Sequence, residues 1–282
     1  MHTPVFLEKV LSHVHRPPDI KYIDCTLGEG GHTRALAKMG LEVLAMDADR
    51  SQLDAFDSQE LTTAERARIT LVEGNFAHIR AIAKKHGFTQ CDGVLFDLGL
   101  SMRQLNTGDG FSYKYLHQPL DMIINTVAKQ GGATRAADVV TLYTYDELTA
   151  VIERYGERVN APKIARAIVT ERAHKKIETV GDLVQIVSKV TSQHDLPALF
   201  QAIRIEVNGE FQNLIEGLDG AMGTVRPGGT LQVIAFHSGE DRIVKLWARK
   251  NKVEEVAKYV GRAISKDKFE KSAVLRVYRS SL

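Results

Sequence analysis

The amino-acid sequence predicts an α/β protein whose parallel sheet is interrupted by a helical insertion. In the first part of the chain, short apolar runs alternate with segments of helical character. After Asp97 this alternation stops, helical segments follow one another, and strand-like runs return only from Thr230 onward. Alternating strands and helices are typical of a parallel sheet that is covered by helices on both faces.

Four short apolar runs are expected to form the first strands of the sheet, because each is brief and bounded by turn residues. The segments between them, such as 32–39 and 51–59, are expected to be the covering helices. The expected strands are 22–25, 42–47, 69–72 and 93–97.

The middle of the chain is expected to be helical after a glycine-rich loop at 108–110. Apolar residues at 183, 186, 187 and 190 recur with the spacing of one helix face. Thr179 followed by Asp182 predicts an N-cap with an acidic residue at the third helical position. Strand character returns at 231–236 and 274–278.

These patterns favour one α/β domain with a second domain inserted into it. The α/β domain is expected to comprise residues 1–107 and 199–282, and the helical insertion residues 108–198. The insertion has about the size of a small domain, and we expect it to help bind the substrate. The sequence shows no internal repeat and no low-complexity tract.

The composition is that of an ordinary globular protein, with 44% hydrophobic and 26% charged residues. No apolar run is long enough to span a bilayer, and no signal pattern precedes the first strand, so we expect a cytoplasmic protein without a membrane partner. The mature form of a mitochondrial or plastid matrix protein is the alternative. Cys25 and Cys91 lie in or beside strand-like runs and are expected to be buried, reduced thiols. The sequence suggests no metal site.

The charge is unevenly distributed along the chain. From Arg226 to Leu282 there are 13 Lys and Arg against 6 Asp and Glu, so this tail carries +7 while the whole chain carries +2. Such a tail could lie against a phosphate backbone or could form a solvated helical face. Charge alone does not separate these interpretations.

A glycine-rich loop between the first strand and the first covering helix indicates a cofactor site. Gly28, Gly30 and Gly31 follow Asp24, and Asp47 ends the second strand, where a carboxylate can accept hydrogen bonds from ribose hydroxyls. Thr33 stands where a dinucleotide fingerprint has its third glycine. A carboxylate at position 24 would repel a pyrophosphate, so the loop favours S-adenosylmethionine over NAD. The alternative is a tight turn that binds nothing.

Asp97 ends the fourth strand and is followed by Leu-Gly-Leu-Ser. A carboxylate here could orient an amine beside a methyl donor and accept a hydrogen bond from its N–H as charge develops. A role that is structural, or limited to the cofactor, is the alternative.

A series of short motifs occurs in order along almost the whole chain. They are His2–Val5, Asp24–His32, Asn75-Phe76, Asp97–Ser101, Gln104-Leu105, Gly110–Ser112, Pro119–Met122, Tyr155–Glu157, Ile164–Val169, Phe200–Ile205, Val207-Asn208, Arg226–Gly229, Phe236–Lys245 and Ser272–Arg276. In this order they resemble the MraW/RsmH family of methyltransferases, which methylate N4 of a cytidine in small-subunit ribosomal RNA.

The resemblance implies a class I S-adenosylmethionine-dependent methyltransferase fold, Rossmann-like, with an inserted helical domain that helps bind RNA. It implies a cytidine in the decoding region as the target, and ribosomal RNA or the assembled small subunit as the partner. Phe76 would flank the adenine ring of the cofactor. The cofactor contacts that it implies are Gly30, Gly31, His32, Asp47, Phe76, Asp97 and Gln104.

Other residues of the motifs are candidates for the substrate side. His237 and Asp241 follow a strand at the functional edge of the sheet, although Ser238 and Asp241 could instead form a helix N-cap pair. His32, taken without the family, is more typical of a helix start than of a ligand or base. A homodimer is left open. The substrate-side candidates are Asp121, Arg204, Asn208, His237, Asp241 and Arg242.

Several positions depart from the usual pattern of the family. Residues 123–125 read Ile-Ile-Asn in place of Arg-Met-Asp, and Asp109 replaces an Arg before Gly-Phe-Ser. Gly239 replaces a Leu, Arg103 is gained, and the stretch between 260 and 272 is short. The cofactor residues keep the pattern, so the departures concern the side that would face RNA.

Two other functions are consistent with these departures. A catalytically weakened assembly factor for the small ribosomal subunit would keep the fold without transferring methyl groups. A small-molecule methyltransferase would turn over without RNA and would be indifferent to salt, unlike an enzyme that binds phosphates.

Overall fold

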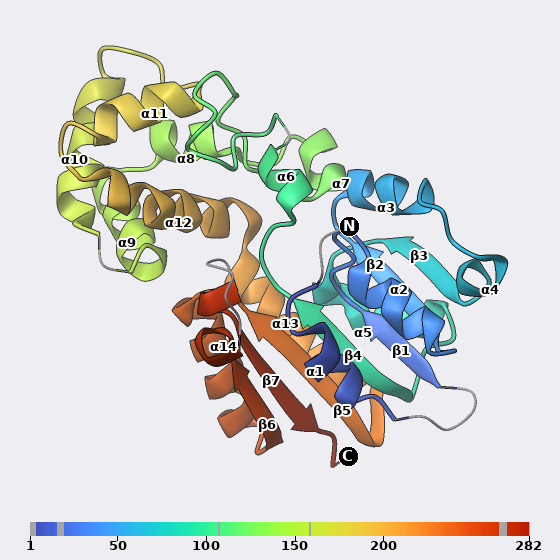
Figure 1. The fold of residues 1–282 in the computed structure, drawn as a ribbon. Helices are drawn as coiled ribbons and strands as arrows, with labels where there is room; N and C mark the ends of the chain where they lie inside the picture. Colours follow the sequence, from blue (N-terminus) through green and yellow to red (C-terminus); the bar gives the residue numbers. More distant parts are fainter. Residues whose placement is uncertain (1–3, 16–19, 107, 158, 265–269, 282) are drawn as a thin grey trace. The chain divides into compact units, whose positions relative to one another are not determined.

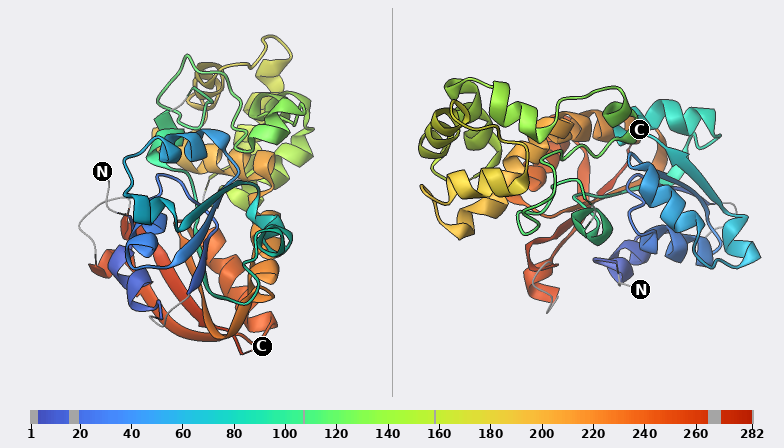
Figure 2. Two further views of the ribbon diagram at one scale, coloured as in Figure 1. Left: turned by 90° about the vertical axis from the view of Figure 1, so that its right-hand side faces the viewer. Right: turned by 90° about the horizontal axis from the view of Figure 1, so that it is seen from above.

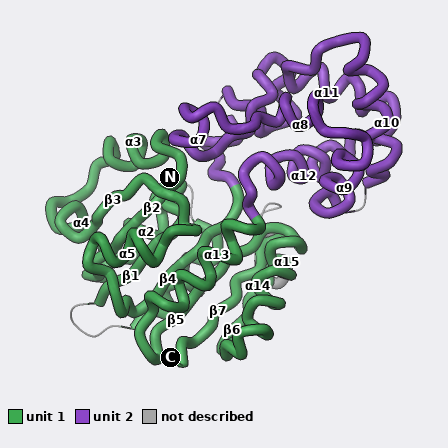
Figure 3. The backbone as a smooth tube through the Cα atoms, turned by 180° about the vertical axis from the view of Figure 1, so that it is seen from behind, with its two compact units in different colours: residues 1–99, 211–282 green, residues 100–210 purple. Residues whose placement is uncertain are grey.

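The computed structural model describes residues 4–15, 20–106, 108–157, 159–264 and 270–281. His2 and Thr3 of the opening motif, and part of the stretch 260–272, lie outside these residues. The chain forms two compact units, one of residues 1–99 and 211–282 and the other of residues 100–210 (Figure 3). The boundary expected at 198/199 falls inside helix α12 (Leu196–Asn208), and all of that helix belongs to the second unit.

The first unit is built on a seven-stranded sheet with the order β3-β2-β1-β4-β5-β7-β6 (Figure 1). Strands β1 to β5 are parallel, and β7 is antiparallel to both β5 and β6. This arrangement confirms the predicted Rossmann-like α/β fold. The strands are β1 (Lys21–Asp24), β2 (Glu42–Asp47), β3 (Ile69–Glu73), β4 (Cys91–Asp97), β5 (Val225–Ala235), β6 (Glu254–Val260) and β7 (Val274–Arg279).

The sequence did not indicate β6. Its residues are partly exposed along the strand, and Glu254, Glu255 and Lys258 give it no apolar run. An edge strand has a neighbour on one side only, so its pairing leaves little hydrophobic signal.

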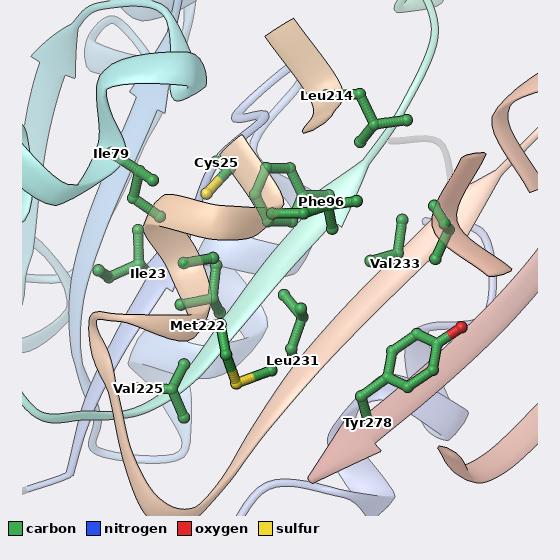
Figure 4. Close-up of a cluster of buried hydrophobic side chains, with 14 of the residues drawn as sticks. Ile23, Cys25, Ile79, Phe96, Leu214, Met222, Val225, Leu231, Val233 and Tyr278 are labelled. Carbon is green, nitrogen blue, oxygen red and sulfur yellow. The ribbon is translucent and has the colours of Figure 1, made fainter. Parts of the chain in front are cut away.

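Helices cover both faces of the sheet, as the alternation of elements predicts (Figures 1 and 2). Side chains of α1, α2 and α3 pack in one core, and side chains of α5, α13 and α14 pack in the core on the opposite face (Figure 4). Cys25 and Cys91 are buried free thiols in the second of these cores. The helices of this unit are α1 (Leu7–Ser12), α2 (Gly31–Lys38), α3 (Arg50–Asp57), α4 (Thr63–Arg66), η1 (Phe76–His78), α5 (Ile79–Lys85), α13 (Glu210–Met222), α14 (Ser238–Lys250), α15 (Gly261–Ile264) and η3 (Glu270–Ser272).

The second unit consists, over its described residues, of helices and loops with a hydrophobic core of its own. Ile152, Ile164, Leu183 and Leu199 are among the residues buried there. No helix among the described residues of the chain is both long and apolar enough to cross a membrane. The helices of this unit are α6 (Met102–Asn106), α7 (Thr126–Gln130), α8 (Ala136–Leu142), α9 (Tyr145–Tyr155), α10 (Ala161–Arg172), α11 (Val180–Val187), η2 (Gln193–Asp195) and α12.

The predicted cap of α11 is confirmed. The Asp182 N–H donates to the Thr179 hydroxyl at 3.1 Å, and the Thr179 N–H donates to the Asp182 carboxylate at 3.0 Å. This reciprocal pair satisfies two backbone donors that a helix start would otherwise leave unpaired.

We expect Thr179→Ala to lower the stability of α11 by about 1 kcal/mol, because the alanine cannot accept the bond from the Asp182 N–H. Hydrogen exchange of the α11 amides measures this, since it reports local opening. Thr179→Ser keeps the hydroxyl and should retain the protection. Equal protection in wild type and Thr179→Ala would show that tertiary packing alone holds the helix start.

Candidate active site

Three carboxylates meet at one edge of the sheet. Asp24, Asp47 and Asp97 are the last residues of β1, β2 and β4, which are parallel neighbours. The carboxyl ends of parallel strands lie at the same edge, where ligands of open α/β sheets bind. The structure therefore brings together the acids that the sequence assigned to the cofactor and to the reacting group.

The glycine-rich loop is fastened to the end of β2. The Gly28 N–H donates to Asp47 Oδ2 at 3.0 Å, and the Asp49 N–H donates to Asp47 Oδ1 at 2.9 Å. Gly28 and Gly30 have φ angles of 50° and 78°. A Cβ on Gly30 would lie 2.0 Å from the Phe56 ring, and one on Gly31 would lie 2.2 Å from Pro4. Glycine at 30 and 31 is therefore required for close packing around the start of α2.

Two threonines, which the sequence did not single out, connect the carboxylates. The Thr33 hydroxyl donates to Asp24 Oδ2 at 2.7 Å, and the Asp97 backbone N–H donates to Thr26 Oγ1 at 2.7 Å. Thr33 stands where a dinucleotide site has its third glycine, and this hydrogen bond to Asp24 gives the replacement a physical reason. The position of both threonines within the loop motif was the available signal.

His32 lies beside Asp97 inside the site. Its Nε2 is 3.6 Å from Asp97 Oδ2, and the residue is 5% exposed. It is the second residue of α2, and Gly30 is the N-cap, so His32 does not cap the helix. Among the described residues, both ring nitrogens of His32 and Asp97 Oδ1 are buried without a hydrogen-bond partner. Buried polar atoms of this kind mark a place for a ligand.

Burial dominates the electrostatics of these acids. It raises the pKa of Asp24 to about 6, against the opposing effects of His32 and the Thr33 hydroxyl. It also raises the pKa of Asp47 to about 6, although two backbone N–H groups favour the carboxylate. Burial lowers the pKa of His32, but Asp97 and Asp24 more than reverse this, so that its pKa is raised.

The charge of the site fits a cationic ligand. Asp24 and Asp97 repel one another, as do Asp24 and Asp47, and a pyrophosphate would add to this repulsion. S-adenosylmethionine carries a sulfonium and an ammonium group, which three carboxylates would favour. The residues present therefore fit this cofactor.

The remaining cofactor candidates lie on two different units. Phe76 opens η1 after β3, is half-buried, and packs edge-to-face on Phe96 with ring centroids 5.4 Å apart. Gln104 belongs to the second unit, where its side chain accepts from the Ser101 N–H at 3.0 Å and its own N–H donates to the Ser101 hydroxyl at 3.1 Å.

The predicted N-cap pair of Ser238 and Asp241 is wrong. His237 caps α14, and the partner at the third helical position is Glu240, whose carboxylate accepts from the Phe236 and His237 N–H groups at 2.8 and 3.3 Å. Asp241 instead binds Arg276, with nitrogen–oxygen distances of 2.7 and 3.0 Å. Arg276 is 4% exposed, and removal of a partner from a buried ion pair is costly.

The substrate candidates of the second unit have partners within that unit. Arg204 donates two hydrogen bonds to Glu210, at 2.8 and 3.0 Å. The Asn208 side chain accepts from the Ile124 N–H at 2.8 Å and donates to the Met122 carbonyl at 2.7 Å. Asp121 accepts from the Ile123 N–H at 3.0 Å. The contacts of Asn208 and Asp121 position the segment 122–124.

The glycine at 239 is explained by its neighbours. A Cβ there would lie 2.8 Å from Phe211 Cζ and 3.1 Å from His237 Nδ1. The rings of Phe211 and His237 lie 5.9 Å apart with a tilt of 30°. Phe211 therefore occupies the space that a larger residue at 239 would need.

We expect Asp24→Asn to change how stability depends on pH. A folded-state pKa near 6, above the ordinary value of 3.8, means that the folded protein binds this proton more tightly than the unfolded chain. The contribution of Asp24 to the free energy of unfolding is then greatest below pH 4. It falls by roughly 1–3 kcal/mol as the pH rises through 6. Asparagine has no such titration, and the Thr33 hydroxyl can accept from its amide.

Urea unfolding followed by the fluorescence of Trp247, the single tryptophan, measures this effect between pH 4 and 7. The variant should lose less stability than wild type over that interval. Asp54→Asn, at an exposed carboxylate of α3, is the control and should follow wild type. If Asp24→Asn also follows wild type, Asp24 is not the group that titrates.

We expect the effect of Gly239→Ala on the free energy of unfolding to change sign when Phe211 is replaced by a smaller residue. Alanine favours a helix over glycine by about 1 kcal/mol. In wild type the clash with Phe211 should outweigh this and lower the free energy of unfolding by about 1 kcal/mol. In a Phe211→Ala background, Gly239→Ala should be stabilising. A double-mutant cycle followed by Trp247 fluorescence tests this, and additive effects would contradict it.

Comparisons with known proteins identify the family to which the chain belongs. The model of the MraW methylase family matches residues 1–276. A ribosomal RNA small subunit methyltransferase H of Clostridioides difficile (strain 630) is 38% identical over 256 residues, which cover 86% of this chain and 80% of the relative.

Solved structures that resemble the chain include an rRNA methylase from Streptococcus thermophilus, with 9% identity and a TM-score of 0.45 over 100% of this chain and 99% of that one. A Streptococcus mutans protein in complex with SAH has 10% identity and a TM-score of 0.45, with 99% of each chain covered. At these scores the structural likeness adds nothing to the sequence match. Because the family model covers nearly the whole chain, the protein belongs to the MraW methylase family and is a methyltransferase that uses S-adenosylmethionine.

Proposed function

We propose that this methyltransferase modifies the N4 amine of a cytidine in the decoding region of small-subunit ribosomal RNA. The observation that carries the proposal is Asp97, whose Oδ1 is buried at the end of β4 without a hydrogen-bond partner among the described residues. The name of the Clostridioides difficile relative supports ribosomal RNA of the small subunit as the substrate.

An exocyclic amine of cytosine is a weak nucleophile, because its lone pair is delocalised into the ring. The enzyme must therefore hold the amine in line and accept a hydrogen bond from its N–H as positive charge develops on nitrogen. Asp97 can do this with Oδ1, while Oδ2 faces His32 and the backbone N–H is held by Thr26. The bound cofactor supplies an electrophilic methyl group.

The other residues of the edge would bind the cofactor. Asp47 would accept hydrogen bonds from the ribose hydroxyls, and Phe76 would flank the adenine. Asp24 and the loop would hold the charged amino-acid end. The proposed cofactor set is Asp24, Gly28, Gly30, Gly31, His32, Asp47, Phe76, Asp97 and Gln104.

We propose that the helical unit, residues 100–210, binds RNA, and that the protein acts in the cytoplasm. Asn208 and Asp121 would act there through the segment 122–124, which they position, and Arg204 would act through its ion pair with Glu210. His237 and Arg242 are proposed to face the substrate, whereas Asp241 would act through Arg276. A splayed cytidine is the expected target, because base pairing hides the amine.

A second candidate function is a catalytically weakened assembly factor of the small subunit. The departures at 123–125 and at Asp109 favour it. Lys129 bridges Asp109 and Asp121, so the cation nearest this segment is held between two acids. Methyl transfer distinguishes the two functions.

Transfer of labelled methyl to small subunits that lack the modification, with the product mapped by mass spectrometry, tests the proposal. We expect label on N4 of one cytidine, and a loss of about 100-fold or more for Asp97→Asn, which keeps the shape but not the charge. Asp54→Asn should keep wild-type activity.

Binding of cofactor and subunit by wild type without any label would refute catalysis and favour the assembly factor. Turnover of small amines without RNA, at a rate indifferent to salt, would favour a small-molecule enzyme.

A further inference from the structure

Two groups of cations in the basic tail differ in their partners. Arg226 is paired with Asp92, and Arg276 is bound by Asp241 and Glu255. These two cations are committed to holding strands together. A second group lies exposed on α14 and consists of Arg242, Lys245, Arg249 and Lys250.

The second group forms one face of the helix. Positions 242, 245, 249 and 250 follow the spacing that places side chains on one side of a helix, and Val244, Trp247 and Ala248 are buried on the other. We call the four exposed cations the α14 basic face. From Arg242 to Arg249 it extends about 10 Å along the axis.

Among the residues that the structure describes, no carboxylate is paired with this face. The two acids of α14 are used elsewhere, since Glu240 is buried in the capping box and Asp241 binds Arg276. In the part of the chain that the structure describes, none of the four cations of the face forms an ion pair with a carboxylate. The positive charge is therefore available to a ligand.

Helix α14 follows β5, the strand that pairs with the strand of the proposed reacting group. Strand β5 leads into α14 and pairs with β4 so that Asp97 lies opposite Ile234, and the Leu98 N–H donates to the Ile234 carbonyl at 3.0 Å. Arg242 is the fifth residue of α14, so it lies in the part of the helix that follows the carboxyl end of β5. A nucleic acid strand whose base enters the site would have its backbone nearby.

We propose that the α14 basic face binds the phosphate backbone of the RNA next to the target nucleotide. The inference rests on the proposed function. Arginine and lysine in a row are suited to phosphodiesters, and each contact releases counterions. A membrane surface fits less well, because the apolar face of α14 is buried in the core and Leu246, at 53% exposed, is isolated among the cations.

The test compares two matched triple variants. Lys245→Gln, Arg249→Gln and Lys250→Gln remove three charges of the face, two of them in the last turn of α14. Arg80→Gln, Lys84→Gln and Lys85→Gln remove two lysines and one arginine from α5, again with two in its last turn. Helix α5 packs on the same side of the sheet but follows β3. Both variants lose the same charge and the same interaction with the helix dipole.

The binding of small ribosomal subunits that lack the modification is measured between 50 and 300 mM salt. The slope of log affinity against log salt should decrease by about 2 for the α14 variant, at roughly 0.7 for each lost phosphate contact. The KM for RNA in methyl transfer should rise at least tenfold. The α5 variant should keep the slope and the KM of wild type, and S-adenosylmethionine binding should be unchanged in both variants.

An equal decrease of slope in both variants would overturn the proposal, because it would reflect net charge and not a located surface. Unchanged binding by the α14 variant, while wild type methylates the RNA, would overturn it and leave the proposed function intact. Loss of binding to phosphatidylcholine vesicles with 30% phosphatidylglycerol, without a change toward RNA, would assign the face to a membrane. Wild type that neither binds nor methylates RNA would refute the proposed function itself.

Discussion

The convergence of three carboxylates at the ends of β1, β2 and β4 is the constraint on which the rest of the site depends. Parallel strands place their carboxyl ends on the same side of the sheet, so the three acids lie close to one another. Burial disfavours the charges of Asp24 and Asp47, and hydrogen bonds from Thr33, Gly28 and Asp49 compensate for part of the cost. The site therefore favours a ligand that has positive charge and hydrogen-bond donors. A methyl donor with a sulfonium and an ammonium group supplies both.

Helix α14 has a structural role on its inner side and the proposed RNA-binding role on its outer side. Its inner side is fixed by the capping box of His237 and Glu240, by Trp247, whose indole N–H donates to Asp219 at 2.6 Å, and by the pair of Asp241 and Arg276. Since its acids serve the interior, the charged side chains that are exposed on its outer side are all basic. The residues of the helix start that resemble the family are thus mainly structural, and the charge that can recognise RNA comes from the following turns.

The departures from the family are accommodated locally. Phe211 fills the space beside Gly239, Lys129 lies between Asp109 and Asp121, and Asn208 holds the backbone of 122–124 through Ile124 and Met122. Each adjustment keeps buried polar groups paired or keeps side chains closely packed. The altered positions therefore have partners in the structure, and the residues proposed to bind the cofactor keep the family pattern.

The sequence by itself determined the α/β class, six of the seven strands, the cofactor loop and the cap of α11, because these depend on short-range patterns of apolar residues, glycines and caps. Only the tertiary structure decided the partners of Asp241 and Arg204, the role of Thr26 and Thr33, and the start of α14 at His237. Arg276 lies 35 positions from Asp241, and β6 has no apolar run of its own. Such pairings depend on where distant segments are brought by the sheet, and local sequence patterns carry no information about that.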